Sequence, residues 1–300
     1  MKSKIINLET FLQGGIGNQF YIYCAAIMVK NKIGEHCNLI ANISNFYTNK
    51  KEIRDLGIFK LFNDIDVNYS CEFKTKSSNF DVILMKLCRR FIFLKSLIEL
   101  FFNLKFVIED EDLIKLMKLN QFPSRIILCG YFQSNQVIER SFMSDLRENT
   151  INEENNNSIA IHIRLGDYLN PPYNNIYYIV TKDYLLRSLD MHRNSLSSLK
   201  RIKVKVFSDD IKMAIKLVQD AYGDEVDIEY SENKSPIQDI LEISTYRRRI
   251  LSNSTFSILC HYLSSEGEST IPKTWYKDKP TSENLVISKS IKNKMIAIDL

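Results

Sequence analysis

The chain has 300 residues, a length that suits two ordinary domains or one large fold with a single core. It is 45% hydrophobic and 25% charged, proportions typical of a globular protein, which exclude a disordered chain, a collagen and a small disulfide scaffold. The 40 basic and 36 acidic residues give a formal net charge of +4, too small to indicate a nucleic-acid partner.

The opening of the chain predicts a strand, a tight turn and a helix. The strand covers residues 5–12, the glycine-rich turn residues 13–17 and the helix residues 18–32. The predicted apolar face of this helix carries Phe20, Cys24, Ile27 and Met28. The apolar stretch before the turn is too short for the hydrophobic region of a signal peptide, so we expect a cytoplasmic location.

The region from residue 40 to residue 125 gives mixed and mostly helical signals. Its most apolar part, residues 91–108, is interrupted by Lys95, Glu99 and Lys105, which excludes a membrane-spanning helix. We expect a helix packed on the protein here. An anchor that lies on the membrane surface is the alternative.

A polar run at residues 149–158 separates two apolar-patterned halves, as an inter-domain linker or an exposed loop does. We therefore predict an N-terminal domain at residues 1–157 and a C-terminal domain at residues 158–300. The last helix of the chain could pack back on the N-terminal domain.

The second half alternates predicted strands and helices. Strands are predicted at residues 159–164, 204–207 and 250–251, and helices at residues 210–222, from residue 236, and from about 254 to 263. Ser235 and Gln238 form a capping box with Pro236 at the first helical position. This alternation indicates a parallel, doubly wound sheet, and together with the opening of the chain it predicts two facing α/β domains of the nucleotide-binding type.

The six cysteines stand at positions 24, 37, 71, 88, 129 and 260. They include no Cys-x-x-Cys pair and no companion histidine at zinc spacing. We therefore expect reduced thiols in the core and no bound metal.

Four polar stretches lie where ligands bind in open α/β sheets, beyond the carboxyl ends of strands. They are GGIGNQ at residues 14–19, HIRLGD at 162–167, SDD at 208–210 and NSTFS at 253–257. In the first, Gly15 and Gly17 allow a tight turn ahead of a helix N-terminus that favours an anion. An ordinary turn is the alternative. A dinucleotide fingerprint is excluded because Phe20 occupies the place of its third glycine.

The HIRLGD stretch places a cation on a strand end. His162 and Arg164 lie on the same side of the predicted strand, where the guanidinium can bind a phosphate or a carboxylate. A structural salt bridge from Arg164 to Asp167 is the alternative interpretation.

The other two stretches offer a carboxylate pair and a hydroxyl-rich helix start. One of Asp209 and Asp210 can accept hydrogen bonds from a guanine base or a ribose while the other caps the next helix. Ser254 opens either a second anion site or an ordinary helix cap.

These stretches, in this order and spacing, resemble the α-1,2-fucosyltransferase family of bacteria and animals. QGGIGNQ at residues 13–19 is similar to the family's GGLGNQ, GYFQS at 130–134 to its GYWQS, and HIRLGDY at 162–168 to its HxRRGDY. FSDD at 207–210, STFS at 254–257 and PKTWY at 272–276 are similar to its FSDD, SSFS and closing PxxW[FY] blocks. The matches extend from residue 13 to residue 276.

The resemblance implies a GT-B fold, with two facing Rossmann-like domains and a cleft between them. It implies metal-independent, inverting transfer of L-fucose from GDP-fucose to a sugar hydroxyl, expected to be O2 of a galactoside, in the synthesis of a bacterial surface polysaccharide such as O-antigen. The N-terminal domain would hold the acceptor and the C-terminal domain the GDP-sugar, without a cofactor, a nucleic-acid partner or a transmembrane segment. A lipid-linked acceptor at the inner face of the cytoplasmic membrane would bring peripheral contact through residues 91–108 or 247–249.

The same resemblance implies roles for single residues. Arg164 would bind the β-phosphate and stabilise the leaving GDP, and Asn18 would approach the diphosphate and the reacting centre. The other expected donor contacts come from Gly15, Gly17, His162, Asp209, Asp210, Ser254, Thr255 and Phe256. Asp167 is the candidate general base, with orientation of Arg164 as its alternative role.

The sequence departs from the family pattern at three places. Leu165 replaces a second arginine, residues 247–249 replace a histidine pair, and Ile258 and Leu259 replace two tryptophans. The donor sugar is therefore open between fucose and a related GDP-6-deoxyhexose such as colitose. A non-catalytic protein that binds sugar nucleotides or glycans, and an NAD-dependent enzyme, are the hypotheses from other classes.

Overall fold

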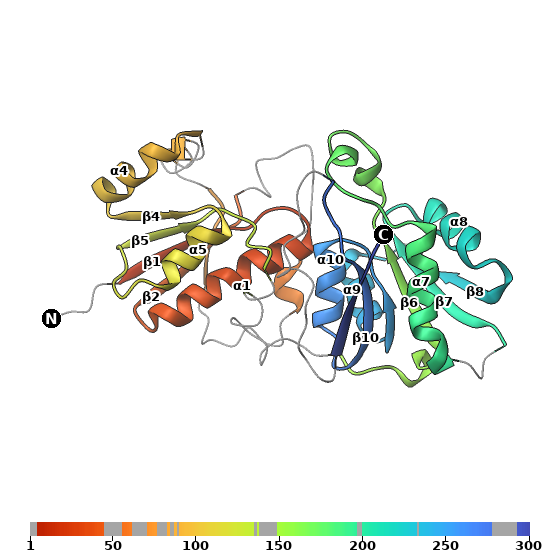
Figure 1. Ribbon diagram of the computed structural model, residues 1–300. Helices are drawn as coiled ribbons and strands as arrows, with labels where there is room; N and C mark the ends of the chain where they lie inside the picture. Colours follow the sequence, from red (N-terminus) through yellow and green to blue (C-terminus); the bar gives the residue numbers. More distant parts are fainter. Residues whose placement is uncertain are drawn as a thin grey trace. The chain divides into compact units, whose positions relative to one another are not determined.

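The computed structural model describes residues 5–44, 56–61, 71–76, 83–84, 87–88, 90–134, 137, 149–196, 200–232, 234–277 and 293–300. The chain divides into two compact units, unit 1 at Met1–Leu146 and unit 2 at Arg147–Leu300. Each unit is built on an open parallel sheet that carries helices (Figure 1). The prediction of an α/β protein with two Rossmann-like units, as in the GT-B class, is confirmed.

Unit 1 carries a five-stranded sheet in the order β3-β2-β1-β5-β4. Its strands are β1 (Ile6–Phe11), β2 (Cys37–Asn42), β3 (Cys71–Lys74), β4 (Leu104–Val107) and β5 (Arg125–Leu128). The described helices are α1 (Ile16–Ile33), α4 (Ile92–Phe102) and α5 (Asp110–Met117), and a short 3₁₀ helix covers Ile58–Leu61. The strand order turns round between β1 and β5, which makes their carboxyl ends the switch point of this sheet.

The helix α1 follows β1 directly, as predicted, but it is buried on all sides and not on one apolar face alone. Every residue from Gln19 to Val29 is buried, so the helix lies in the core of unit 1 and not on one face of it. Gly15 is its N-cap, and Gly14 before it has a φ of 75°, a conformation that favours glycine.

The described part of residues 40–125 is mixed, with the helices α4 and α5 and also strands that the sequence did not indicate. The strands β3 and β4 lie there with four residues each, too few for an alternating pattern to be recognised. Residues 91–108 contain the expected helix α4, but Asn103, with a φ of 47°, ends it and β4 follows at once. On α4 the side chains of Leu100 and Phe101 are 82% and 84% exposed, so the outer face of this helix is not packed.

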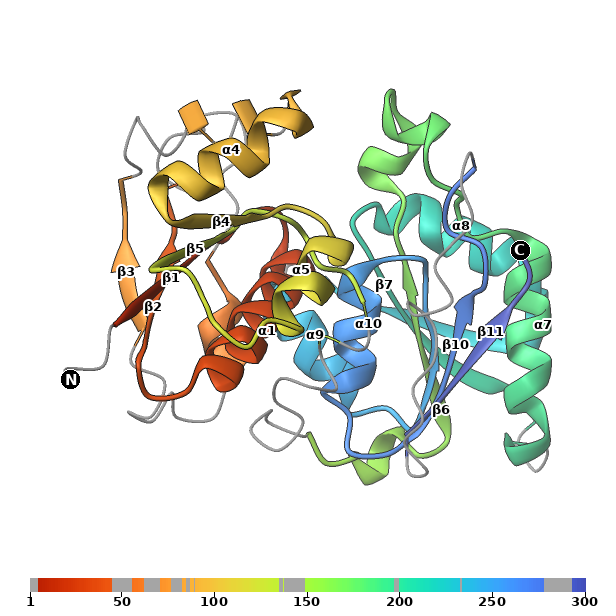
Figure 2. The ribbon, with the colours of Figure 1, turned by 60° about the vertical axis from the view of Figure 1, so that its left-hand side comes forward.

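Unit 2 carries a six-stranded sheet in the order β11-β10-β9-β6-β7-β8 (Figure 2). Its strands are β6 (Ser158–Ile163), β7 (Ile202–Ser208), β8 (Val226–Tyr230), β9 (Arg248–Ile250), β10 (Gly267–Pro272) and β11 (Asn293–Ile298). The described helices are α7 (Lys182–Arg193), α8 (Ile211–Tyr222), α9 (Pro236–Ser244) and α10 (Thr255–Tyr262). This is the doubly wound order of a Rossmann sheet, and it turns round between β6 and β9.

The polar run at residues 149–158 is part of unit 2, because hydrogen bonds hold it there. The backbone N–H of Asn152 donates to the carbonyl oxygen of Thr245 at 3.0 Å, and Asn149 pairs with Ser264 in a parallel bridge. The division between the units therefore falls before this run, at Leu146 and Arg147, and not at residue 157.

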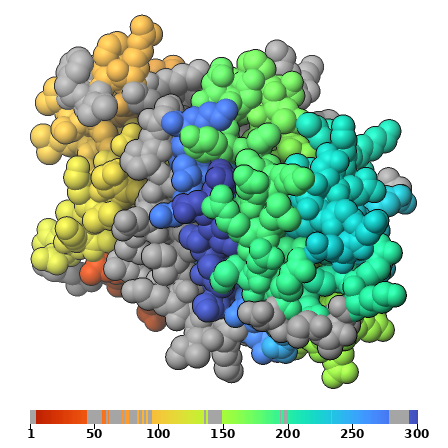
Figure 3. Space-filling view, turned by 45° about the vertical axis from the view of Figure 1, so that its right-hand side comes forward, coloured from red at the N-terminus to blue at the C-terminus, as the bar shows by residue number. Residues whose placement is uncertain are grey.

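The end of the chain also belongs to the sheet of unit 2. The last described element is the strand β11, which pairs in parallel with β10 and lies against α7 (Figure 3). Residues 293–298 are therefore a strand of this sheet, and the packing of a final helix on the N-terminal domain stays a prediction.

The arginine run at residues 247–249 serves the fold of unit 2. Arg249 is completely buried, and its Nε donates to Oγ of Ser269 at 2.8 Å while Nη1 donates to the carbonyl oxygen of Tyr246. Arg247 pairs with Glu266 at 2.7 Å. The expectation that this run contacts a membrane is wrong for Arg249, because its guanidinium is buried and donates hydrogen bonds inside unit 2.

Two further expectations concern the cysteines and the membrane. Cys24, Cys37, Cys88, Cys129 and Cys260 are free and buried, in agreement with the prediction of reduced core thiols. Of the helices in the described parts of the chain, none has the length and apolar character needed to cross a membrane.

Candidate functional site

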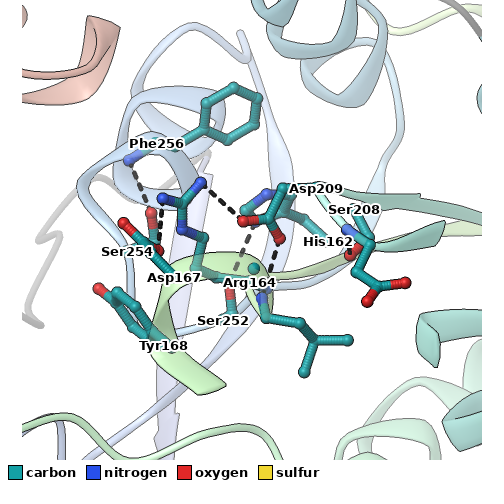
Figure 4. A network of polar contacts seen from close by, with 12 residues as sticks. His162, Arg164, Asp167, Tyr168, Ser208, Asp209, Ser252, Ser254 and Phe256 are labelled. Carbon is teal, nitrogen blue, oxygen red and sulfur yellow. Dashed lines mark hydrogen bonds and ion pairs between the residues drawn. The ribbon is translucent and has the colours of Figure 1, made fainter. Parts of the chain in front are cut away.

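Three of the four predicted polar stretches meet at the switch point of unit 2. Arg164 directly follows the carboxyl end of β6. Ser254 follows the carboxyl end of β9, the strand paired with β6. The strand β7, on the other side of β6, ends just before Asp209. In open α/β sheets the crevice at this point is where ligands bind, so its residues are the candidate site (Figure 4).

Arg164 is held between two carboxylates at this edge (Figure 4). Its Nη2 donates to Oδ1 of Asp167 at 2.7 Å, and its Nη1 pairs with Oδ2 of Asp209 at 2.9 Å. The guanidinium carbon also lies 5.7 Å from the ring centre of Tyr168. A guanidinium has five N–H donors and these contacts engage two, so Arg164 is fixed in place with donors left for an anion.

Asp209 is anchored by the loop that follows β6. Its Oδ1 accepts a hydrogen bond from the backbone N–H of Leu165 at 2.9 Å while its other oxygen faces Arg164. A Cβ atom added to Gly166 would lie 2.3 Å from Oδ2 of Asp209, so a glycine is needed for this approach. The Leu165 side chain, at the place of the family's second arginine, is buried in the core of unit 2.

Of the two predicted uses of the aspartate pair, the helix cap is confirmed, and contact with a base or a ribose stays a prediction. Asp210 is the N-cap of α8, because its Oδ1 accepts from the backbone N–H of Met213 at 3.2 Å. Asp209 is engaged with Arg164 and the β6 loop, and this engagement makes it a positioning group for the guanidinium.

His162 is buried beneath the site and connects its two strand ends. Its Nδ1 lies 2.7 Å from Oγ of Ser257 and 3.1 Å from Oγ of Ser252, and its ring stacks on Phe256 with centres 4.6 Å apart. Oγ of Ser252 accepts from the backbone N–H of Arg164 at 3.2 Å. Burial, and then the charge of Arg164, lower the pKa of His162 to about 3, so the imidazole is neutral near pH 7.

We expect His162 to make the folded protein sensitive to acid. Its pKa is lowered from 6.5 to about 3, so the stability that the neutral ring contributes is complete above about pH 6.5 and is lost as the pH falls toward 3. Between about pH 7.5 and pH 5 the free energy of unfolding should therefore fall by about 2 kcal/mol through His162 alone. Urea unfolding of the wild type and of His162→Gln at both pH values measures it. Equal losses in the two proteins would contradict the prediction.

The helix α10 begins beside Arg164 and is capped by Ser254. The Ser254 Oγ accepts from the backbone N–H of Phe256 at 3.2 Å, which confirms the helix cap predicted there. Figure 4 shows Ser254 and Phe256 next to the Arg164 guanidinium. Thr255, the first residue of the helix, is half-buried at the same place. The partial positive charge of a helix N-terminus therefore adds to the charge of Arg164.

The first predicted stretch lies at the switch point of unit 1. Asn18, in the first turn of α1, accepts on Oδ1 a hydrogen bond from Nε2 of Gln133, which follows β5. A Cβ atom at Gly14 would lie 2.8 Å from Nδ2 of Asn18. Gly15 caps the helix, and Gly17 is buried in its first turn. The GGIGNQ and GYFQS blocks are thus brought together within unit 1. The HIRLGD, SDD and NSTFS stretches are brought together in the same way within unit 2.

The groups that hold the predicted residues were given no role by the sequence, although Ser257 and Tyr168 lie within the motifs quoted above. Ser252 and Ser257 surround His162, and Tyr168 lies in a stack with Tyr177, with ring centres 4.4 Å apart. The serines could have been expected, because a buried histidine needs hydrogen-bond partners and both flank the helix start. In the residues that the structure describes, no three His, Cys, Asp or Glu side chains gather as a metal site.

Comparison with known proteins supplies a family. A model of glycosyl transferase family 11 matches residues 127–292, just over half of the chain. An α-1,2-colitosyltransferase of Escherichia coli is 27% identical over 124 residues, which are 40% of this chain and 42% of that protein, less than half of its length. The O-antigen biosynthesis glycosyltransferase WbnK of Escherichia coli is 22% identical over 296 residues, 88% of this chain and 93% of that one. The crystal structure of the fucosyltransferase NodZ from Bradyrhizobium has 11% identity and a TM-score of 0.49, with 87% of this chain and 94% of NodZ covered.

Proposed function

Because this chain belongs to glycosyl transferase family 11, we propose that it transfers L-fucose from GDP-fucose to O2 of a galactoside with inversion, in the synthesis of O-antigen. The observation that carries the proposal is the guanidinium of Arg164, fixed beside the start of α10 at the switch point of unit 2. Transfer of colitose from GDP-colitose is the second candidate, favoured by the similarity to the α-1,2-colitosyltransferase.

The proposed reaction develops a negative charge on the diphosphate of the donor, which we propose binds beside Arg164 and the N-terminus of α10. The acceptor oxygen forms a bond to C1 of the donor sugar, and the bond from C1 to the β-phosphate oxygen breaks. The bonding electrons leave with GDP, and the hydroxyl proton passes to a base or to water. The charge that develops on the departing diphosphate is stabilised by Arg164 and by the N-terminus of α10, because both are positive and already in place.

The carboxylates beside Arg164 are assigned to positioning. Asp167 is the candidate general base in the sequence, but its Oδ1 is engaged with Arg164 at 2.7 Å, which supports the orienting role. Asp209 restrains the same guanidinium from the side of β7. Thr255 and Phe256 would contact the donor near its phosphates and base, and Asn18 would approach the reacting centre from unit 1.

The acceptor is proposed to be a lipid-linked polysaccharide precursor at the inner face of the cytoplasmic membrane. Unit 1 would supply most of its contacts. The exposed Leu100 and Phe101 of α4 would provide peripheral contact with the membrane, since Arg249 is buried and cannot.

The test is incubation with GDP-fucose or GDP-colitose and a set of galactosides in the presence of EDTA, followed by mass and linkage analysis. An α-1,2-fucosylated product is expected. Product from GDP-colitose alone would favour the second candidate, and activity that EDTA abolishes would contradict the metal-independent mechanism. Binding of GDP without transfer to any acceptor would favour a non-catalytic binding protein.

A further inference from the structure

A group of tyrosines follows the strands β6 and β10, and one of them, Tyr168, lies beside Arg164. The loop after β6 supplies four of them and the segment after β10 supplies the fifth. We call the following residues the tyrosine cluster: Tyr168, Tyr173, Tyr177, Tyr178 and Tyr276. Figures 1 and 2 show the loop, in green, projecting beyond the sheet of unit 2.

Four rings of the cluster, those of Tyr168, Tyr173, Tyr177 and Tyr276, pack on one another, starting at the guanidinium. Tyr168 lies against Arg164 and stacks on Tyr177, with the ring planes only 5° apart. The ring of Tyr177 is in turn 5.4 Å from that of Tyr276 and 6.3 Å from that of Tyr173. The stack therefore extends from Arg164, the proposed phosphate-binding residue, to the rings of Tyr173 and Tyr276.

The backbone of the loop is fixed to the body of unit 2. Tyr177 and Tyr276 form an antiparallel bridge, and the backbone N–H of Tyr178 donates to the carbonyl oxygen of Trp275 at 3.0 Å. The buried Asn253, which precedes the helix cap, donates from Nδ2 to the carbonyl oxygen of Tyr178 at 2.7 Å. A surface fixed in this way loses little conformational entropy when a ligand binds.

Two rings of the cluster remain open to solvent. Tyr173, whose ring contacts Tyr177, is 41% exposed. Tyr178 follows Tyr177 in the chain and is 37% exposed, with Nζ of Lys277 5.8 Å from its ring centre. An aromatic face with a hydroxyl at its rim suits a pyranose, which has an apolar C–H face and hydroxyls around its edge. A diphosphate, which is anionic and has no apolar face, would find no such match on these rings.

The position of the cluster in the sheet indicates which sugar it would meet. Arg164 stands at the centre, after β6, with Asp209 on the side of β7. The cluster lies on the opposite side, toward β10, because Tyr276 follows that strand. Asp209 is thus on one side of the guanidinium, and the aromatic rings are on the other.

We propose that the tyrosine cluster binds a sugar ring of the acceptor glycan by stacking, with Tyr173 and Tyr178 as the contact residues. The inference rests on the proposed function and deepens it, because it assigns part of acceptor recognition to unit 2. It makes the aromatic loop a determinant of which glycan is used, while Arg164 and α10 hold the donor.

Steady-state kinetics of Tyr173→Ala and Tyr178→Ala test the proposal. The KM for a galactoside acceptor should rise about three- to tenfold in each, the effect expected from the loss of one aromatic contact, while the KM for the GDP-sugar and the hydrolysis of that donor without acceptor stay unchanged. Tyr173→Phe should keep the acceptor KM of the wild type. Tyr230→Ala is the matched control, because that ring is 44% exposed on the edge strand β8.

An unchanged acceptor KM in both alanine variants would overturn the inference, and so would an equal rise in the KM for the donor, which would assign the rings to the nucleotide sugar. Saturation-transfer NMR with lactose separates this result from a failure of the proposed function, since it needs no turnover. Lactose contacts in the wild type that are lost in Tyr173→Ala would support the cluster even if no transfer were found. Lactose contacts that persist in both variants, or that the wild type does not show, would refute it.

Discussion

Replacement of Arg164 by alanine is expected to lower kcat about 10²- to 10³-fold, as the loss of one preorganised donor to a developing negative charge typically does. The guanidinium is fixed by Asp167 at 2.7 Å and Asp209 at 2.9 Å before any ligand binds, so its stabilising effect requires no reorganisation during the reaction. The measurement is the initial rate of GDP release with donor and acceptor both saturating.

The same substitution should also weaken GDP binding, because it leaves two carboxylates facing the phosphates without their cation. Arg164→Lys keeps the charge but cannot reach both aspartates in a fork, so we expect it to recover only part of the rate. Arg193→Ala removes an exposed arginine that pairs with Glu225, and it should change neither rate nor affinity. A kcat for Arg164→Ala close to that of the wild type would remove the leaving-group role.

Replacement of Gly166 by alanine is expected to lower kcat/KM about 10- to 100-fold, although the residue has no functional group. The new methyl group would lie 2.3 Å from Oδ2 of Asp209, so the carboxylate must move away from Arg164. The loss corresponds to one hydrogen bond to a charged group, about 1.5 to 3 kcal/mol. Kinetics and urea unfolding, measured together, show whether the fold survives while activity falls.

A double-mutant cycle identifies the cause of that loss. The substitution Asp209→Ala removes the atoms that the methyl group meets and leaves only Cβ, at 3.7 Å, so Gly166→Ala should cost little more in a chain that already carries Asp209→Ala. If the alanine costs the same with and without this second substitution, the contact between Gly166 and Asp209 does not explain its effect.

Local features of unit 2 were predictable because they depend on neighbours in the sequence. The capping box of Ser235 and Gln238, the cap at Ser254 and the buried strand before Arg164 all appear where they were predicted. Each follows from residue types within a few positions, and local hydrogen bonds decide them whatever the rest of the chain does.

Other features depended on partners distant in the sequence and were predicted wrongly or not at all. The four-residue strands β3 and β4 become strands only because β2 and β5 lie beside them. Arg249 resembles a surface cation in sequence, yet two loops and the strand β10 supply oxygens that accept its hydrogen bonds in the interior. The tyrosine cluster joins residue 276 to a loop about a hundred positions earlier.

By itself the sequence determined the α/β class, the four polar stretches and the family to which they belong. Strands, helix caps and glycine turns depend on residues only a few positions apart, so short patterns indicate them. Only the tertiary structure decided that Asp209 restrains Arg164, that Asp210 caps a helix, that His162 is a neutral buried group and that four tyrosine rings pack together. These outcomes depend on which strand ends become neighbours, and strand order is set by burial of the whole sheet and not by any local run of residues.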